Sequence, residues 1–403
     1  MKQSGARRTG GEAEAGNGLA TLRGRLFQDP ELAARLAAIG QPEPFIAAVV
    51  ELAGNEGIRL APSEIADALR PDPLGIGRFG PAPVTLDRWP APGWAPARSS
   101  PTGGAPALDW IWFGEEGLRG AFYEDAVRRC WSRPLNLLSR GRTSFAALLA
   151  DRAAQFLPAP DGFIFHMSRC GSTLLAQMLG RLPGQAVLSE PEPVDAIVQW
   201  ASLAAAPAQA AAALGAVVRA LGRGHAGAGR RLFIKLDAWH SLALPLFREA
   251  FPEVPWIFLY REPLAVMASQ MRVPGVHVVP GVLPGDLLGI GSGEPIGLEE
   301  YCARALAQIC RAAIDHWPLG GGLLVNYSEL RAGVPPGVAA HFGLAPTPAE
   351  SEIMASAAEH HSKTGAPFSP DSAGQEQRSA VLERAVERHL RGLFEQLEAL
   401  RLG

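Results

Sequence analysis

The stretch from Gly162 to Leu179 constrains the fold of this chain more than any other segment, because it reads GFIFHMSRCGSTLLAQML. An apolar run is followed by small and polar residues and then by good helix formers, which predicts a buried strand, a tight loop and a helix. A loop at the start of a helix directs backbone N–H groups outward, and this arrangement suits an anion such as phosphate. Arg169 adds a planar cation, and Ser172 and Thr173 add hydroxyl donors. The stretch therefore indicates an anion-binding loop, although a strand, loop and helix of this kind can also be purely structural.

After Gly162 the pattern alternates between strands and helices. We expect strands at Phe163–His166, Ala186–Ser189, Leu232–Leu236, Trp256–Tyr260 and Leu323–Asn326. We expect helices at Ser172–Leu182, Pro193–Leu203, Ala208–Leu221, Leu242–Phe251, Pro263–Met271, Leu298–His316 and Gln375–Leu402. Continuously apolar strands indicate a parallel sheet that helices cover on both faces, which is an α/β fold. Ligands bind such sheets at the carboxyl ends of the strands, so residues that directly follow a strand are the candidates for the site.

The loop departs from the ATP-binding pattern G-x-x-x-x-G-K-[ST], because His166 replaces the first Gly and Ser172 replaces the Lys. It resembles instead the 5′-phosphosulfate loop of sulfotransferases that use 3′-phosphoadenosine 5′-phosphosulfate (PAPS), with the core Ser168-Arg169-Cys170-Gly171-Ser172-Thr173. Arg in place of Lys is similar to the tyrosylprotein and carbohydrate branches. This resemblance implies a P-loop-like parallel sheet, and it implies that Arg169, Cys170, Gly171, Ser172 and Thr173 bind the cofactor.

A second motif follows the strand at 256–260. Arg261 ends that strand, Pro263 starts a helix, and Ser269 lies eight residues after Arg261, as in the 3′-phosphate motif of the same family. An Arg at a strand tip and a hydroxyl on the next helix can bind one phosphate. Arg261 could instead be a partner in an ordinary ion pair, but its position after the phosphosulfate-like loop favours the sulfotransferase interpretation.

Two further strand tips supply candidates for catalysis. Lys235 corresponds to a family Lys that contacts the bridging or sulfuryl oxygens, and Glu190 corresponds to the general base of the tyrosylprotein branch. A base is required because the acceptor hydroxyl loses its proton as it attacks sulfur. Glu192 is a rival for this role, Asp237 stands where the cytosolic branch has a His base, and His240 lies nearby. The carboxylates could also be ordinary loop acids.

Two weaker matches complete the predicted site. Tyr327 matches a family Tyr near the nucleotide, and Lys363 lies in a segment that resembles the basic loop over the cofactor. His360 and His361 suggest a metal, but no third ligand stands at a recognisable spacing, so we expect no metal. The resemblance extends over residues 162–371. Between its motifs, the long Pro- and Gly-rich loop from Val273 to Gly297 indicates a lid or an acceptor loop.

The N-terminal part has a different composition. We predict a disordered tail over residues 1–20 and a small all-α module over 21–70, with helix starts near Pro30, Pro42 and Pro62. The module resembles the leader-peptide-like domain first met in nitrogen-fixing bacteria, which implies possible peptide recognition; a simple docking module is the alternative. Residues 71–106 are Pro-rich and predict a linker or strap, part of which docks onto the catalytic domain through Trp89 and Trp94. We assign residues 107–403 to the sulfotransferase domain. Its first part, from Trp110 to Leu149, is either an extension packed on the main sheet or an acceptor-binding element.

Composition restricts the class of partner and the compartment that we expect for this chain. The chain has 403 residues, 47% of them apolar, and a net charge of −3, so no strongly basic surface indicates nucleic acid. Its four Cys lack metal-ligand spacing, and with no signal peptide or membrane-length apolar run we expect a cytoplasmic protein with reduced thiols. The sequence thus predicts a PAPS-dependent sulfotransferase acting on a hydroxyl or amine of a small-molecule, carbohydrate or peptide acceptor. The alternatives are a nucleotide-dependent phosphotransferase and a non-catalytic nucleotide- or peptide-binding protein.

Overall fold

The computed structural model describes residues 10–70, 81–101, 104–114, 122–151, 156–203, 208–223, 230–283, 286–290, 296–359 and 380–403. The chain divides into two compact units. Unit 1 comprises Met1–Leu118 with Asp125–Phe156, and unit 2 comprises Arg119–Glu124 with Leu157–Gly403.

Unit 1 begins with helices. They are α1 (Gly10–Leu26), α2 (Pro30–Ala37), α3 (Pro42–Asn55) and α4 (Pro62–Ala68). The three predicted starts are present, and the Asp29 carboxylate caps α2 by accepting a hydrogen bond from the backbone N–H of Leu32 at 2.9 Å. We predicted disorder over residues 1–20, yet α1 occupies half of that range, because its second half buries Leu22 and Leu26.

A mixed sheet forms the rest of unit 1. Its strands β1 (Val84–Leu86), β2 (Trp94–Ser100), β3 (Ala107–Trp112) and β4 (Gly141–Thr143) lie in the order β1-β4-β3-β2. The helices α5 (Tyr123–Trp131) and α6 (Pro134–Leu138) lie between β3 and β4 in the chain, and α7 (Phe145–Ala150) follows β4.

Two segments of the predicted strap, β1 and β2, are strands of this sheet. Trp94 and Trp89 are buried as expected, but their indole N–H groups donate to the carbonyls of Leu26 and Leu148, both at 3.1 Å, within unit 1. Since β2 from the Pro-rich segment pairs with β3, residues 107–118 and 125–150 lie with the N-terminal unit. The division after Phe156 therefore falls later in the chain than our boundary at residue 107.

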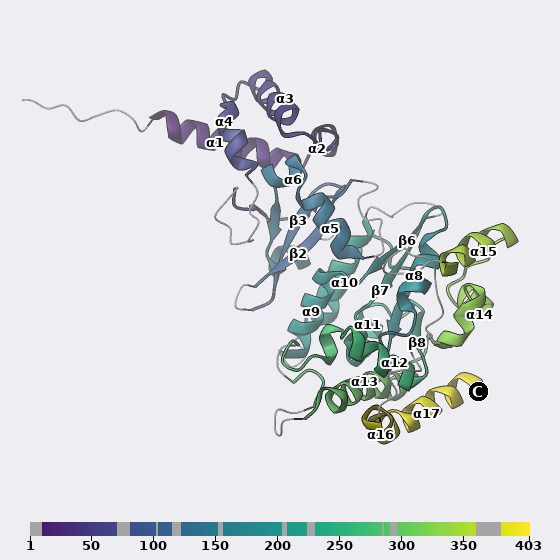
Figure 1. Ribbon diagram of the computed structural model, residues 1–403. Coiled ribbons are helices and arrows are strands. Elements are labelled where there is room, and N and C mark those ends of the chain that lie inside the picture. The colour runs from purple at the N-terminus through teal and green to yellow at the C-terminus, as the bar shows by residue number, and fades with distance from the viewer. Residues whose placement is uncertain are drawn as a thin grey trace, which may run out of the picture. The chain divides into compact units, whose positions relative to one another are not determined.

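Unit 2 is an α/β domain built on a five-stranded parallel sheet, as the sequence predicted. The strands β5 (Gly162–His166), β6 (Gln185–Ser189), β7 (Arg231–Lys235), β8 (Trp256–Tyr260) and β9 (Gly322–Asn326) lie in the order β6-β7-β5-β8-β9. Each starts within one residue of its predicted position. Figure 1 shows this sheet with helices packed around it. The connections run first to one side of β5 and then to the other, which places the loop after β5 at the switch point of the sheet.

The helices predicted for unit 2 are present. The helices of this unit are α8 (Ser172–Gly180), α9 (Glu192–Leu203), α10 (Ala210–Gly222), α11 (Leu244–Ala250), α12 (Pro263–Arg272), α13 (Leu298–Asp315), α14 (Pro336–His341), α15 (Pro348–Ala355), α16 (Ala380–His389) and α17 (Arg391–Leu402). Of these, α14 and α15 occur in addition to the predicted ones. Short 3₁₀ turns include η3 (Ala238–Ala243), η4 (Val276–Val278) and η6 (Tyr327–Ala332). The long C-terminal helix predicted over residues 375–402 is two helices in its described part, with a break at Leu390.

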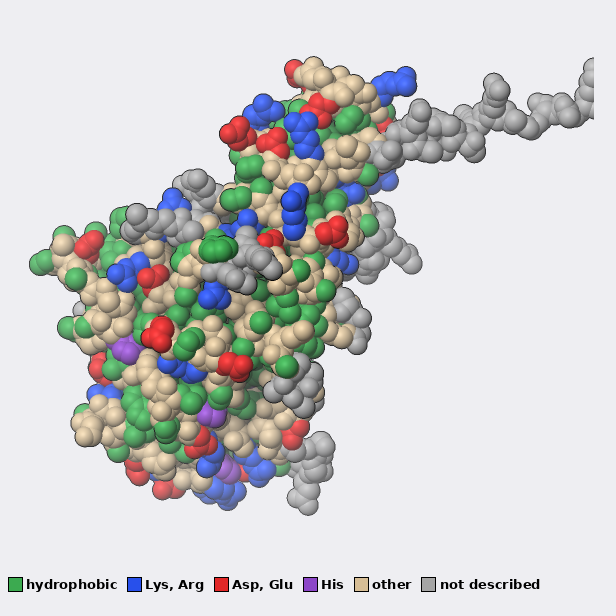
Figure 2. Space-filling view, turned by 180° about the vertical axis from the view of Figure 1, so that it is seen from behind, with side chains coloured by type: hydrophobic (Ala, Val, Ile, Leu, Met, Phe, Trp, Pro, Cys, Tyr) green, Lys and Arg blue, Asp and Glu red, His purple; other side chains and the backbone are tan. Residues whose placement is uncertain are grey.

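One face of the molecule is mixed in charge (Figure 2). Figure 2 shows acidic and basic side chains interspersed on the face that it presents. Among the helices of the described ranges, none is both long and apolar enough to cross a membrane.

Candidate active site

The loop after β5 has the backbone of an anion-binding site. Ser168, Arg169 and Gly171 have positive φ angles of 73°, 49° and 88°. Only Gly adopts this region readily, so the two non-Gly residues store strain of about 1–3 kcal/mol each. Left-handed residues in a loop before a helix turn successive N–H groups into a concavity that binds phosphate-like anions. The helix that follows, α8, starts at Ser172.

His166 holds this loop in place. Its Nε2 donates to the carbonyl of Leu236 at 2.9 Å, so its Nδ1 is unprotonated and accepts from the backbone N–H of Ser168 at 3.0 Å. Burial, and then the positive charge of Lys235, lower the pKa of His166 well below its usual range. The ring is therefore neutral at physiological pH. His166 replaces the Gly of an ATP-binding loop, and here it is a structural part of the turn.

Gly171 allows the loop to meet Tyr327. A Cβ at Gly171 would lie 2.6 Å from Cδ2 and 2.8 Å from Cε2 of the Tyr327 ring, so no larger residue fits. The guanidinium of Arg261 lies over the Tyr327 ring, 4.4 Å from its centroid. The structure thus brings together Gly171, Arg261 and Tyr327, which the sequence had assigned to the nucleotide from three separate motifs.

Glu190 and Lys235 form an ion pair at the same edge of the sheet. The Lys235 ammonium donates to Glu190 Oε1, and the backbone N–H of Glu190 donates to the carbonyl of Lys235 at 2.7 Å. The Lys235 side chain is 1% exposed and that of Glu190 is 34% exposed, so the carboxylate is the accessible member of the pair. Glu190 has a φ of 55°, another strained residue at a strand end. Its Oε1 also lies 4.0 Å from His166 Nε2, which connects the pair to the loop.

The remaining loop residues fall into two groups. Arg169 is half-buried, and its guanidinium donates to the carbonyl of Val273. Cys170 is fully buried, its thiol donates to the carbonyl of Leu259 at 3.1 Å, and burial raises its pKa to about 12. The Cys170 side chain is therefore a neutral packing group, and only its backbone can serve a ligand. Ser172 and Thr173 are buried at the start of α8.

Two polar residues of the site were not predicted from the sequence. Gln270, next to the predicted Ser269, is fully buried; its amide donates to Ser168 Oγ at 3.0 Å and accepts from the Gly275 N–H at 2.8 Å. His277 lies in η4 and is 6% exposed. A Gln inside a helix and one His in a Pro- and Gly-rich loop carry no sequence pattern, so only the tertiary contacts identify them. Ser269 itself is half-buried on α12.

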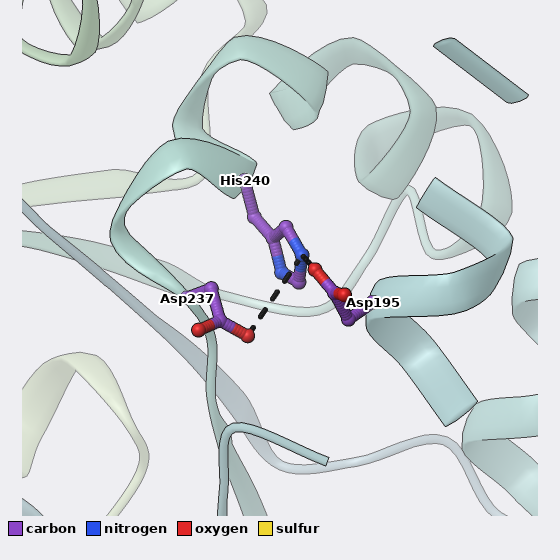
Figure 3. A group of neighbouring side chains, drawn as sticks. All are labelled: Asp195, Asp237 and His240. Carbon is purple, nitrogen blue, oxygen red and sulfur yellow. Dashed lines mark hydrogen bonds and ion pairs between the residues drawn. The ribbon is translucent and has the colours of Figure 1, made fainter. Parts of the chain in front are cut away.

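Asp195, Asp237 and His240 form a cluster of neighbouring side chains (Figure 3). His240 Nε2 lies 2.9 Å from Asp195 Oδ1 and 4.0 Å from Asp237 Oδ2. Trp239 Nε1 and Gln199 Nε2 also donate to the Asp195 carboxylate, at 3.2 and 2.6 Å. Since three N–H donors already satisfy Asp195, these contacts fit an Asp–His hydrogen-bonded pair better than a set of metal ligands. Burial, followed by the negative charges of Glu190 and Asp195, raises the pKa of Asp237 to about 6.

Lys363, with His360 and His361, lies outside the described residues. The other candidates all follow the carboxyl ends of the five parallel strands. They are Arg169 to Thr173 after β5, Glu190 after β6, Lys235 at the end of β7, Arg261 with Ser269 after β8, and Tyr327 after β9.

Comparisons with known proteins give fold-level similarity alone. No model of a protein family matches the chain, and no curated protein matches it. The solved structures that are similar to it include three sulfotransferases. The sulfotransferase domain of a Synechococcus olefin synthase has 17% identity and a TM-score of 0.35, with 60% of this chain and 95% of that chain covered. The sulfotransferase STF1 of Mycobacterium tuberculosis has 13% identity and a TM-score of 0.36, with 59% and 78% covered. A sulfotransferase of Alicyclobacillus acidocaldarius has 14% identity and a TM-score of 0.37, with 61% and 96% covered. Because these identities and TM-scores are low, we base the function on the geometry of the site.

Proposed function

We propose that unit 2 is a PAPS-dependent sulfotransferase that moves a sulfuryl group to a hydroxyl or amine acceptor by in-line transfer. One observation carries this proposal. The buried ammonium of Lys235 and the carboxylate of Glu190 form a pair at the sheet edge that also carries the left-handed anion loop. Sulfuryl transfer requires a fixed cation near the bridging oxygen and a base near the acceptor, and this pair supplies one of each.

Each residue has a role in this reaction. The N–H groups of the loop and the Arg169 guanidinium bind the phosphosulfate. Lys235 neutralises the charge that develops on the bridging oxygen as its bond to sulfur breaks. Glu190 takes the proton of the acceptor as the new bond to sulfur forms. The accessible position of its carboxylate, at 34% exposure, supports the assignment to the acceptor side.

The nucleotide end of PAPS, with its 3′-phosphate, would lie at the carboxyl ends of β8 and β9. Arg261 would bind the 3′-phosphate together with Ser269, and the contact of Arg261 with the Tyr327 ring supports a nucleotide position there. No hydrogen bond joins Arg261 to Ser269 among the described residues, so we expect the phosphate itself to connect them. Lys363 would close over the cofactor. No metal enters this scheme, because Arg and Lys side chains supply the positive charge.

Calorimetry on the full chain tests this function. We expect PAPS to bind in the presence of EDTA, and we expect ATP with Mg²⁺ to bind much more weakly. Preferential binding of MgATP would support the phosphotransferase alternative. If neither nucleotide binds, both nucleotide-dependent functions are wrong and a peptide-binding role remains.

We also propose that unit 1 recognises a peptide acceptor, since residues 21–70 resemble a leader-peptide-recognition domain. A chain that begins at Leu157 should then bind PAPS with unchanged affinity, because residues 157–403 contain all five strands of the parallel sheet. Its KM for a peptide acceptor should be raised. An unchanged KM for every peptide acceptor would remove unit 1 from acceptor recognition.

A further inference from the structure

His277 is a buried polar side chain whose partner is missing from the described part of the chain. Its Nε2 is buried and has no hydrogen-bond partner there. Buried polar atoms are nearly always paired, and an unpaired one costs about 1–3 kcal/mol. A ligand that supplies the missing partner would remove this cost.

The segment that carries His277 is attached to the anion loop at two points. The Arg169 guanidinium donates to the carbonyl of Val273, and Gln270 bridges Ser168 Oγ to the Gly275 N–H. Gly275 also allows the ring to pack closely, because a Cβ there would lie 2.8 Å from His277 Cε1. These contacts fix the imidazole next to the loop, although it comes from a long connection more than one hundred residues later in the chain.

The electrostatic surroundings of His277 connect it to the site. The pKa of His277 is lowered to about 4, first by burial and also by the positive charge of Arg169, while the negative charge of Glu190 opposes this shift. The ring also lowers the pKa of His166. His277 is therefore a neutral imidazole within the fields of the loop cation and of the proposed base. A neutral imidazole can hydrogen-bond an uncharged hydroxyl.

We propose, on the basis of the function proposed above, that His277 binds the acceptor hydroxyl through Nε2 and orients it toward sulfur and Glu190. Nε2 forms a hydrogen bond to the acceptor oxygen and takes part in no covalent step. The acceptor oxygen then forms the bond to sulfur, the bond from sulfur to the bridging phosphate oxygen breaks, and the hydroxyl proton passes to Glu190. His277 is thus a second acceptor-side residue, in addition to the carboxylate that takes the proton.

Two substitutions separate this role from simple packing. His277→Phe keeps a ring against Gly275 and removes both nitrogens, whereas His277→Gln keeps a hydrogen-bonding group near the position of Nε2. We would measure transfer of radioactive sulfate from PAPS to 2-naphthol, to glucose and to water, using the full chain. His316→Ala, at the end of α13, is the matched control for loss of an imidazole outside the site.

We expect His277→Phe to reduce transfer by roughly 10–100-fold, which is the scale of a misplaced reactant, and we expect His277→Gln to keep most of the activity. Both variants should bind PAPS as the unmodified protein does. Full activity in His277→Phe with loss in His277→Gln would show a packing role and overturn the inference. Undetectable transfer by unmodified protein that binds PAPS would also overturn it. If the unmodified protein does not bind PAPS, the proposed function fails instead, and calorimetry distinguishes these two failures.

Discussion

Replacing Glu190 by Gln tests the ion pair and the proposed base in one variant. The change keeps the shape of the side chain and one hydrogen-bond acceptor for Lys235, but it removes the negative charge that faces a fully buried ammonium. Losing one member of a buried pair costs about 3–5 kcal/mol. Because Glu190 is one-third exposed and Gln still accepts a hydrogen bond, we expect a smaller loss of about 1–3 kcal/mol.

Thermal unfolding of the full chain measures this loss. For a unit of this size, each kcal/mol lowers Tm by about 2–4 °C, so Glu190→Gln should lower the Tm of the unit 2 transition by roughly 2–12 °C. The double variant with Lys235→Met should recover part of the loss, because no uncompensated ammonium then remains buried. Glu192→Gln is the control, since Glu192 starts α9 and lies two residues from the paired carboxylate.

Activity gives the second measurement on the same protein. If Glu190 is the base, Glu190→Gln should lower kcat by about 10²–10⁴-fold and leave PAPS affinity nearly unchanged, while Glu192→Gln has a mild effect. Unchanged stability and activity in Glu190→Gln would refute both the energetic role of the pair and the assignment of the base. If activity is lost in Glu192→Gln or in a variant of Asp237 or His240 instead, the base has been assigned to the wrong residue.

Three further predictions concern other parts of the site. Arg261→Ala should weaken PAPS by roughly 10–100-fold, the scale of one charge-assisted hydrogen bond, but should affect adenosine 5′-phosphosulfate little by calorimetry; an equal loss for both ligands would remove Arg261 from the 3′-phosphate. Gly171→Ala should displace the Tyr327 ring and strain the loop, so both Tm and nucleotide affinity should fall, whereas an unchanged affinity would contradict the close packing seen here. The pKa of Asp237 is near 6 in the folded chain against an ordinary 3.8, so the folded state binds more protons between these values and loses stability as pH rises through them. Asp237→Asn should therefore unfold at a higher temperature than the unmodified protein at pH 8, and this difference should shrink below pH 4.

The parallel sheet could be predicted from the sequence because its strands are continuous apolar runs bounded by polar residues. The five strands start within one residue of their expected positions. Since parallel strands present their carboxyl ends at one edge, the positions of Arg169, Glu190, Lys235 and Tyr327 followed from the same pattern. Their roles in catalysis and binding stay predictions.

The small sheet of unit 1 could not be predicted in this way. Strands β1 and β4 have three residues each, too few to show an alternating pattern, and β2 begins in a segment whose Pro content indicates a linker. Pairing of β1 with β4 also joins residues more than fifty positions apart, which no local signal reveals. His277 and Gln270 were missed for a similar reason, since Gln270 matters through its hydrogen bond to Ser168 and His277 through the burial of its ring near the charge of Arg169.

The buried thiols provide an internal probe of local opening. All four cysteines are free and buried, with Cys130 in unit 1 and Cys170, Cys302 and Cys310 in unit 2. An alkylating reagent therefore reaches each thiol only when the surrounding structure opens. Mass spectrometry of the modified peptides would then follow the opening of the two units separately in one unmodified chain. Cys170 would report on the anion loop itself, and slower alkylation of this residue in the presence of a nucleotide would measure how strongly the ligand closes that loop.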